Sequence, residues 1–234
     1  MEMEPAWDIG GAISNGIERF KENAGLVIGA VIMVGFANLL VNVPSNLAQV
    51  ASQAMMAEMD PDQQAMVQIF VGLFQMFIGL ISFVVQTYLG LGLIQLMLNI
   101  VRGNEASFAD FKVPGGVFAA GLGAAFLAAL GTATGMLFCI VPGVMLGMGL
   151  WFQQYVIIDQ QIGAVDALKE SWRLTDGSKL QLFALALVSG LIMLAGMAAC
   201  GVGLLVAGPV VALANATVYN AMVEQKGTAL QPLV

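Results

Sequence analysis

The chain has 234 residues, 59% of them hydrophobic and only 10% charged, with a mean hydropathy of +0.88. A soluble domain of this size carries more charge on its surface, so the composition excludes an ordinary water-soluble fold. The net charge of −7 argues against a nucleic-acid partner, because phosphate binding needs a basic surface. The sequence contains no histidine, which removes the commonest metal ligand and the commonest general base.

Apolar runs of about 20 residues or more recur along the chain, and this is the length that crosses a hydrocarbon layer of about 30 Å. The runs are continuously apolar rather than alternating, which favours helices over a β-barrel. The sequence therefore predicts an all-α integral membrane protein with six transmembrane helices and amphipathic interfacial helices on the cytoplasmic side. No basic region precedes the first apolar run, so we expect this span to be retained rather than cleaved.

Residues 1–23 are predicted to form an N-terminal interfacial segment. Ile9, Ile13, Ile17 and Phe20 share one helical face, which is typical of a helix that lies in the membrane surface. Trp7 is placed to sit at headgroup depth. The expected membrane domain, 24–223, follows this segment.

The first span is predicted at 24–43 and ends at Pro44, and a polar loop over 45–64 follows it. The next apolar stretch, 65–101, would be about 55 Å long as one helix. It has no polar turn that would divide it into two crossings. The later spans are predicted at 114–138, 141–158, 180–200 and 204–222, with a second amphipathic segment at 163–176 and a cytoplasmic tail at 224–234.

The basic residues test this arrangement. With the N-terminus inside, all eight fall on the cytoplasmic side: Arg19, Lys21, Arg102, Lys112, Lys169, Arg173, Lys179 and Lys226. If 65–101 crossed twice, Arg102 and Lys112 would lie outside. We therefore expect one crossing there, tilted, kinked near Gly90 and Gly92, or projecting beyond the bilayer. Both termini are predicted to be cytoplasmic.

Small and polar residues form a stripe along one face of the 65–101 helix: Gln68, Gly72, Gln75, Gly79, Ser82, Gln86 and Gly90. One interpretation is a packing face, within the chain or between protomers, because glycines allow close approach and glutamines bond across helices. The other is the wall of a polar cavity or lipid groove. Four side chains are predicted to anchor the protein at the membrane surface: Trp7, Phe20, Trp172 and Arg173.

Cys139 and Cys200 are both expected near the outer ends of spans, where an oxidising compartment would allow a disulfide between them. The alternative is two buried free thiols. Glu58, Asp60 and Asp62 lack the ligand spacing of a calcium loop and are expected to form a solvated acidic loop. We predict no metal site, no cofactor and no catalytic residue, since no nucleophile, base and oxyanion donor are placed to meet.

The segment from Ala167 to Gly177, ALKESWRLTDG, resembles a motif of bacterial membrane proteins that include the membrane-anchor region of some glycerophosphodiester phosphodiesterases. Val141-Pro142-Gly143, Arg102-Gly103 and the pair Pro209 and Tyr219 are similar too. The resemblance implies a six-span helical domain with interfacial segments. It does not imply phosphodiesterase activity, which belongs to a separate soluble domain.

These features predict a non-enzymatic membrane scaffold or assembly protein that contacts lipids and forms a homo-oligomer or binds a membrane-protein partner. The alternative is a transporter, or transporter subunit, that handles a lipid or small solute. An enzyme is a third and weaker hypothesis. No Asp, Glu, Lys or Arg is expected deep inside a span, which disfavours a pump or an ion-coupled transporter.

Overall fold

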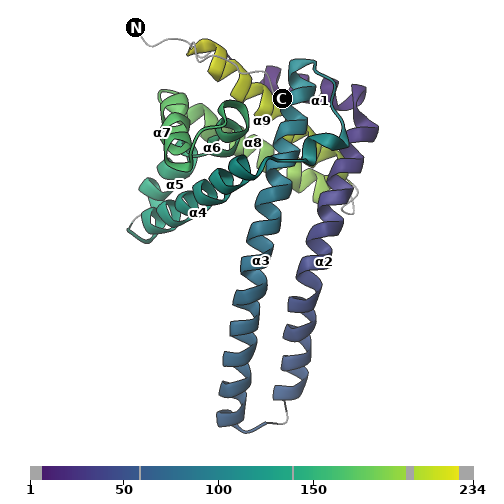
Figure 1. Ribbon diagram of the computed structural model, residues 1–234, viewed down its shortest axis with the longest axis vertical. Coiled ribbons are helices and arrows are strands. Elements are labelled where there is room, and N and C mark those ends of the chain that lie inside the picture. Colours follow the sequence, from purple (N-terminus) through teal and green to yellow (C-terminus); the bar gives the residue numbers. More distant parts are fainter. Residues whose placement is uncertain (1–6, 58, 139, 199–202, 227–234) are drawn as a thin grey trace.

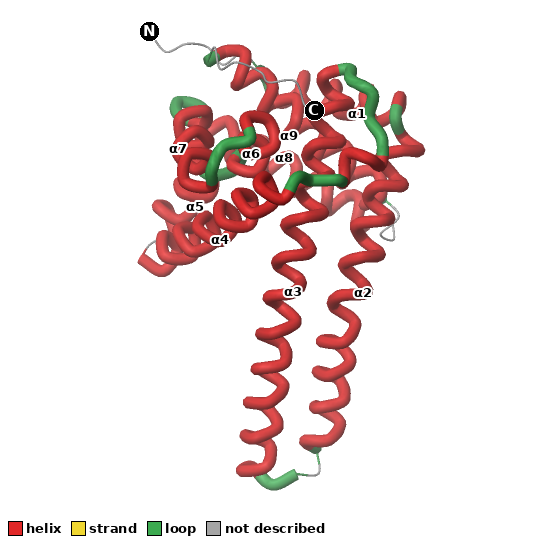
Figure 2. Tube along the Cα trace, viewed as in Figure 1, coloured by secondary structure: helices red, strands yellow, loops and turns green. Residues whose placement is uncertain are grey.

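The computed structural model describes residues 7–57, 59–138, 140–198 and 203–226, and these ranges are helical except for short connections (Figures 1 and 2). In chain order the helices are α1 (Ile9–Glu22), α2 (Ala24–Met56), α3 (Pro61–Arg102), the 3-10 turn η1 (Phe108–Phe111), α4 (Gly115–Phe138), α5 (Ile140–Gly149), α6 (Gln153–Gln160), α7 (Ala164–Thr175), α8 (Lys179–Ala198) and α9 (Leu204–Gln225).

Within the described residues, six stretches are long and apolar enough to cross a membrane. They are Ala24–Met56, Pro61–Arg102, Gly115–Phe138, Val141–Gln160, Lys179–Ala198 and Leu204–Gln225. The number matches the six expected spans, and the chain is an all-helical, multi-pass membrane-like protein. The bounds of α4, α8 and α9 lie within a few residues of the predicted spans wherever the structure describes them.

The first span differs from its prediction, because α2 does not end at Pro44. It continues to Met56, so most of the expected polar loop is helical. Proline has no N–H, so the carbonyl of Leu40 loses one hydrogen bond, but the residues that follow favour a helix and contact α3. The connection that reverses the chain is therefore short.

The 65–101 stretch lies in one continuous helix, α3, as the basic residues led us to expect. Pro61 opens the helix, where a missing N–H costs no internal hydrogen bond. Gly103 ends it with a left-handed φ of 73°, and the N–H of Asn104 donates to the carbonyl of Asn99 at 2.9 Å. The helix therefore has a defined stop directly after Arg102.

The predicted span 141–158 is broken into α5 and α6, which meet at residues 150–152. The backbone groups at the break are satisfied by α7, because Ser171 Oγ accepts from the N–H of Phe152 at 3.2 Å and donates to the carbonyl of Gly149 at 3.0 Å. Sequence hydropathy does not show such a break, since α5, residues 150–152 and residues 155–158 of α6 are all apolar.

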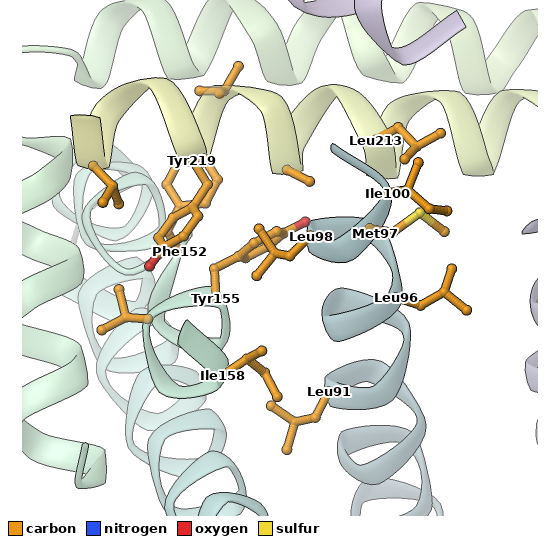
Figure 3. Close-up of a cluster of buried hydrophobic side chains, with 14 of the residues drawn as sticks. Leu91, Leu96, Met97, Leu98, Ile100, Phe152, Tyr155, Ile158, Leu213 and Tyr219 are labelled. Atoms are coloured by element: carbon orange, nitrogen blue, oxygen red, sulfur yellow. The ribbon is translucent and has the colours of Figure 1, made fainter. Parts of the chain in front are cut away.

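Three hairpins, α2–α3, α4–α5 and α8–α9, diverge from one core (Figure 1). Its centre holds fully buried side chains from α3, α6 and α9 and from the break before α6, among them Leu91, Leu98, Phe152, Leu213 and Tyr219 (Figure 3). The α1 helix packs on α9, where the backbone at Gly16 lies so close that an added Cβ would be 2.7 Å from the carbonyl oxygen of Val210. The far part of α2–α3 stands alone below this core.

Candidate functional site

The polar stripe of α3 faces α2. Gln75 Nε2 donates to Gln49 Oε1, and Ser82 Oγ donates to Asn42 Oδ1 at 3.3 Å. These bonds join the two helices at points seven residues, or two helical turns, apart along α3. The middle of the predicted stripe is therefore an interface inside the hairpin.

A cleft of about 320 Å³ opens between α2 and α3 near the end of the hairpin. Its lining is rich in amide side chains and consists of Gln49, Ser52, Gln53, Met56, Gln68, Val71, Gly72 and Gln75. Three residues of the predicted stripe are thus part of a polar cleft. The cleft carries no charged side chain, so it suits neutral hydrogen-bonding groups rather than an ion.

The glycines of the stripe and Gln86 are less enclosed. A Cβ added at Gly72 or Gly79 would meet nothing within 4 Å, so these glycines do not serve close packing within the described chain. Gln86 is exposed, and a Cβ at Gly90 would lie 3.8 Å from Gln154 Oε1. Gly72 borders the cleft between the two helices, whereas Gly79 and Gln86 are exposed, so part of the stripe has no packing partner within the described chain.

The outer face of the hairpin is apolar. Met66, Phe70, Leu73 and Phe77 lie on the side of α3 opposite the polar stripe, and all four are exposed, Phe70 by 73%. Polar groups inside and apolar groups outside are the reverse of a soluble hairpin. This arrangement is what an apolar solvent favours.

A buried polar junction, formed by Arg102, Asp159, Tyr219 and Asn220, joins the ends of α3, α6 and α9. Arg102 Nη1 lies 2.7 Å from Asp159 Oδ1, the Tyr219 hydroxyl donates to Asp159 Oδ2 at 2.9 Å, and Arg102 Nε donates to Asn220 Oδ1 at 2.9 Å. The Asp159 side chain is fully buried. Water therefore screens its interaction with Arg102 only weakly, so removing one of the two charges costs more stability than it would at an exposed pair.

Sequence analysis missed this junction. Asp159 and Arg102 each end an apolar helix, and charges at span ends are ordinarily solvated. The available signal was that one acid and one base end two different spans on the same predicted side. Nothing in the sequence shows that α6 turns both of them into the protein.

Residues 167–177, the segment that resembles a family motif, pack against the break between α5 and α6. Trp172 packs directly on Gly149, where no Cβ would fit, and Thr175 Oγ1 contacts the carbonyl of Gly149 at 3.2 Å. Lys179 Nζ lies 3.6 Å from the centre of the Trp172 ring, a cation–π contact. The segment thus has a clear structural role in this chain.

The four predicted anchors lie in different surroundings. Trp7, which precedes α1, and Phe20 on α1 are both buried in the protein core, so both side chains point into the protein. Trp172 is partly exposed, and Arg173 forms a salt bridge with Glu170 at 2.5 Å. The hydrogen bond to Glu170 raises the pKa of Arg173.

Lys226, which directly follows α9, hydrogen-bonds to the backbone at the end of α7. Its Nζ donates to the carbonyl oxygens of Arg173 at 2.7 Å and of Asp176 at 2.9 Å. Burial lowers the pKa of Lys226, although the charge of Asp176 acts in the opposite direction. The first residues of the predicted 224–234 tail are therefore part of the fold.

Two other predictions concern metals and cysteines. Cys139 and Cys200 lie outside the described residues, so both alternatives, a disulfide and two free thiols, stay predictions. Among the described residues, no group of three or more His, Cys, Asp and Glu is placed to hold a metal ion.

The chain is similar to proteins of mycobacteria. It is 28% identical to an uncharacterised protein of Mycobacterium bovis and to uncharacterised proteins of two Mycobacterium tuberculosis strains, over 92% of this chain and 68% of each relative. No family model and no solved structure matches this chain. The expected kinship with the membrane anchors of glycerophosphodiester phosphodiesterases therefore gains no support.

Proposed function

We propose that this protein is a non-enzymatic scaffold of the bacterial inner membrane, with both termini in the cytoplasm, which self-associates through the α2–α3 hairpin. The observation that supports this most is the isolation of the hairpin from the core. Only 6% of the most apolar 18-residue segment of α3 is buried. The same helix carries a polar stripe in which a Cβ added at Gly72 or Gly79 would meet no other atom within 4 Å.

Helices associate in lipid through small residues and interhelical hydrogen bonds, because lipid is as apolar as leucine. The hairpin offers both features. Gly72 and Gly79 leave room for another backbone, and the exposed amides of Gln68 and Gln86 both donate and accept. No charged residue lies between Asp62 and Arg102, so two copies would bury no charge when they meet.

The test is subunit counting by single-molecule photobleaching after reconstitution at low protein-to-lipid ratios. We expect dimers or larger assemblies for the natural chain. The double variant Gly72→Leu/Gly79→Leu fills the open positions and should weaken association at least tenfold, which corresponds to about 1.4 kcal/mol.

The matched control is Gly190→Leu, because Gly190 on α8 also has open space at its Cβ position. This variant adds the same side chain elsewhere and should associate normally. A natural chain that stays monomeric at all ratios, or equal losses in both variants, would refute the proposal.

The polar cleft favours a second candidate, a lipid- or solute-handling protein. Its four glutamines offer neutral hydrogen-bonding groups inside an apolar hairpin. Transfer of fluorescent phospholipid between leaflets of reconstituted vesicles tests this idea. Transfer that is lost when Gln68 and Gln75 are both changed to Leu would favour it over the scaffold; transfer no faster than in empty vesicles would exclude it for phospholipid.

A further inference from the structure

The α4–α5 hairpin does not extend far from the charged helix α7. The ten residues of α5 span about 15 Å, half of a hydrocarbon layer of about 30 Å. At its end, Gly149 rests on Trp172 of α7, and α7 presents Asp166 and Lys169 with side chains 71% and 74% exposed. These charges keep α7 in water or among headgroups, so the turn of the hairpin lies only about 15 Å from that level.

The partner helix leads to the same result. A Cβ added at Gly123 of α4 would lie 3.3 Å from Ala164 at the start of α7. From Gly123 to the end of α4 is about 15 residues, or about 22 Å. Figure 1 shows α4 running obliquely to α2–α3, and a tilt reduces its depth further.

A charged helix also limits the depth of α8–α9. The α1 helix packs across α9 at Val210 and carries the exposed side chains of Glu18 and Glu22. Only seven residues, about 10 Å of helix, separate Val210 from Gly203 at the start of α9. In Figure 3, α9 runs across α3 rather than along it. If α3 crosses the membrane, α9 is therefore more nearly parallel to the plane of the membrane.

The α2–α3 hairpin is different. About 30 residues separate Pro61 from Leu91, which is fully buried in the core, so α3 extends about 45 Å beyond the core. This length exceeds the hydrocarbon layer. Figure 1 shows its turn at the end of the molecule opposite α1 and α7.

We propose that only α2–α3 crosses the bilayer, while α4–α5 and α8–α9 enter the cytoplasmic leaflet and return. Their exposed apolar side chains, such as Phe126, Leu130, Leu187 and Leu191, then contact acyl chains of that leaflet alone. The partner of this exposed apolar surface is therefore the cytoplasmic lipid leaflet. Two inserted hairpins expand this leaflet relative to the other and favour a membrane that is convex toward the cytoplasm.

Single-cysteine labelling tests this topology in a chain whose two native cysteines are replaced by serine. Asp60→Cys reports on the α2–α3 turn, Leu137→Cys on α4–α5 and Met197→Cys on α8–α9. Spheroplasts and inside-out vesicles are treated with a membrane-impermeant maleimide. We expect labelling of Asp60→Cys from outside only, and of the other two from neither side until detergent is added.

Labelling of Leu137→Cys or Met197→Cys from outside, at the rate of Asp60→Cys, would overturn the inference for that hairpin. Each variant is first checked for the thermal unfolding of the natural chain, and a position that fails is replaced by its exposed neighbour Phe138 or Leu194. The inference does not depend on self-association. A monomeric protein would refute the proposed scaffold and leave this topology intact.

The effect on the leaflet has its own readout, the partition of labelled protein between flat membrane and narrow tubules pulled from giant vesicles. With the cytoplasmic face outward, we expect at least twofold enrichment in tubules. Equal density in both membranes would refute the leaflet expansion.

Discussion

The buried polar junction provides the sharpest test of the fold. Asp159→Asn removes the charge that faces Arg102 Nη1 at 2.7 Å and leaves the guanidinium buried beside a neutral amide. Removing one partner of a buried pair typically costs about 3–5 kcal/mol, because the remaining charge stays in a poorly solvated site. We therefore expect a loss of this size in the free energy of unfolding.

The assay is reversible unfolding in mixed dodecylmaltoside and SDS micelles, followed by tryptophan fluorescence. The exposed pair of Asp166 and Lys169, at 3.6 Å, supplies the matched control. Asp166→Asn makes the same chemical change at the surface and should cost less than about 1 kcal/mol.

A double variant separates the charge from the packing. Replacing Arg102 by Met and Asp159 by Leu removes both charges, and such exchanges are often neutral or stabilising. We expect the double variant to recover part of the stability that Asp159→Asn loses, because it removes the unpaired charge but leaves the Tyr219 hydroxyl and Asn220 Oδ1 without these partners. A loss below about 1 kcal/mol for Asp159→Asn, or a double variant less stable than it, would refute the reasoning.

Two further predictions concern glycines at close contacts. Gly149→Ala places a Cβ in steric overlap with the Cε3–Cζ3 edge of the Trp172 ring, so α7 must move; we expect a loss of about 1–3 kcal/mol in the same unfolding assay and an altered fluorescence spectrum. Gly16→Ala places a Cβ 2.7 Å from the carbonyl oxygen of Val210, and limited proteolysis should then cut α1 faster than in the natural chain. Gly190→Ala, whose Cβ meets open space, should show neither effect, and equal behaviour of all three would contradict the packing described for α7 and α1.

Composition and apolar run length were sufficient to predict an all-helical, membrane-like chain with six long apolar stretches. They determine this because the bilayer imposes one length scale and requires internal hydrogen bonds. The distribution of basic residues further predicted that 65–101 lies in one helix, and α3 has that form. The polar stripe of α3 was also readable, because helical periodicity depends only on local spacing.

The sequence could not place the break between α5 and α6 or the extension of α2 beyond Pro44. Both depend on partners distant in the chain: Ser171 satisfies the backbone at the break, and α3 lies beside the extended part of α2. The burial of Asp159 has the same cause, since a charge at a span end is exposed until another element covers it. Local pattern therefore determined which segments are helices and which are apolar, whereas tertiary contacts alone decided where helices break, which charges are buried and how the three hairpins diverge.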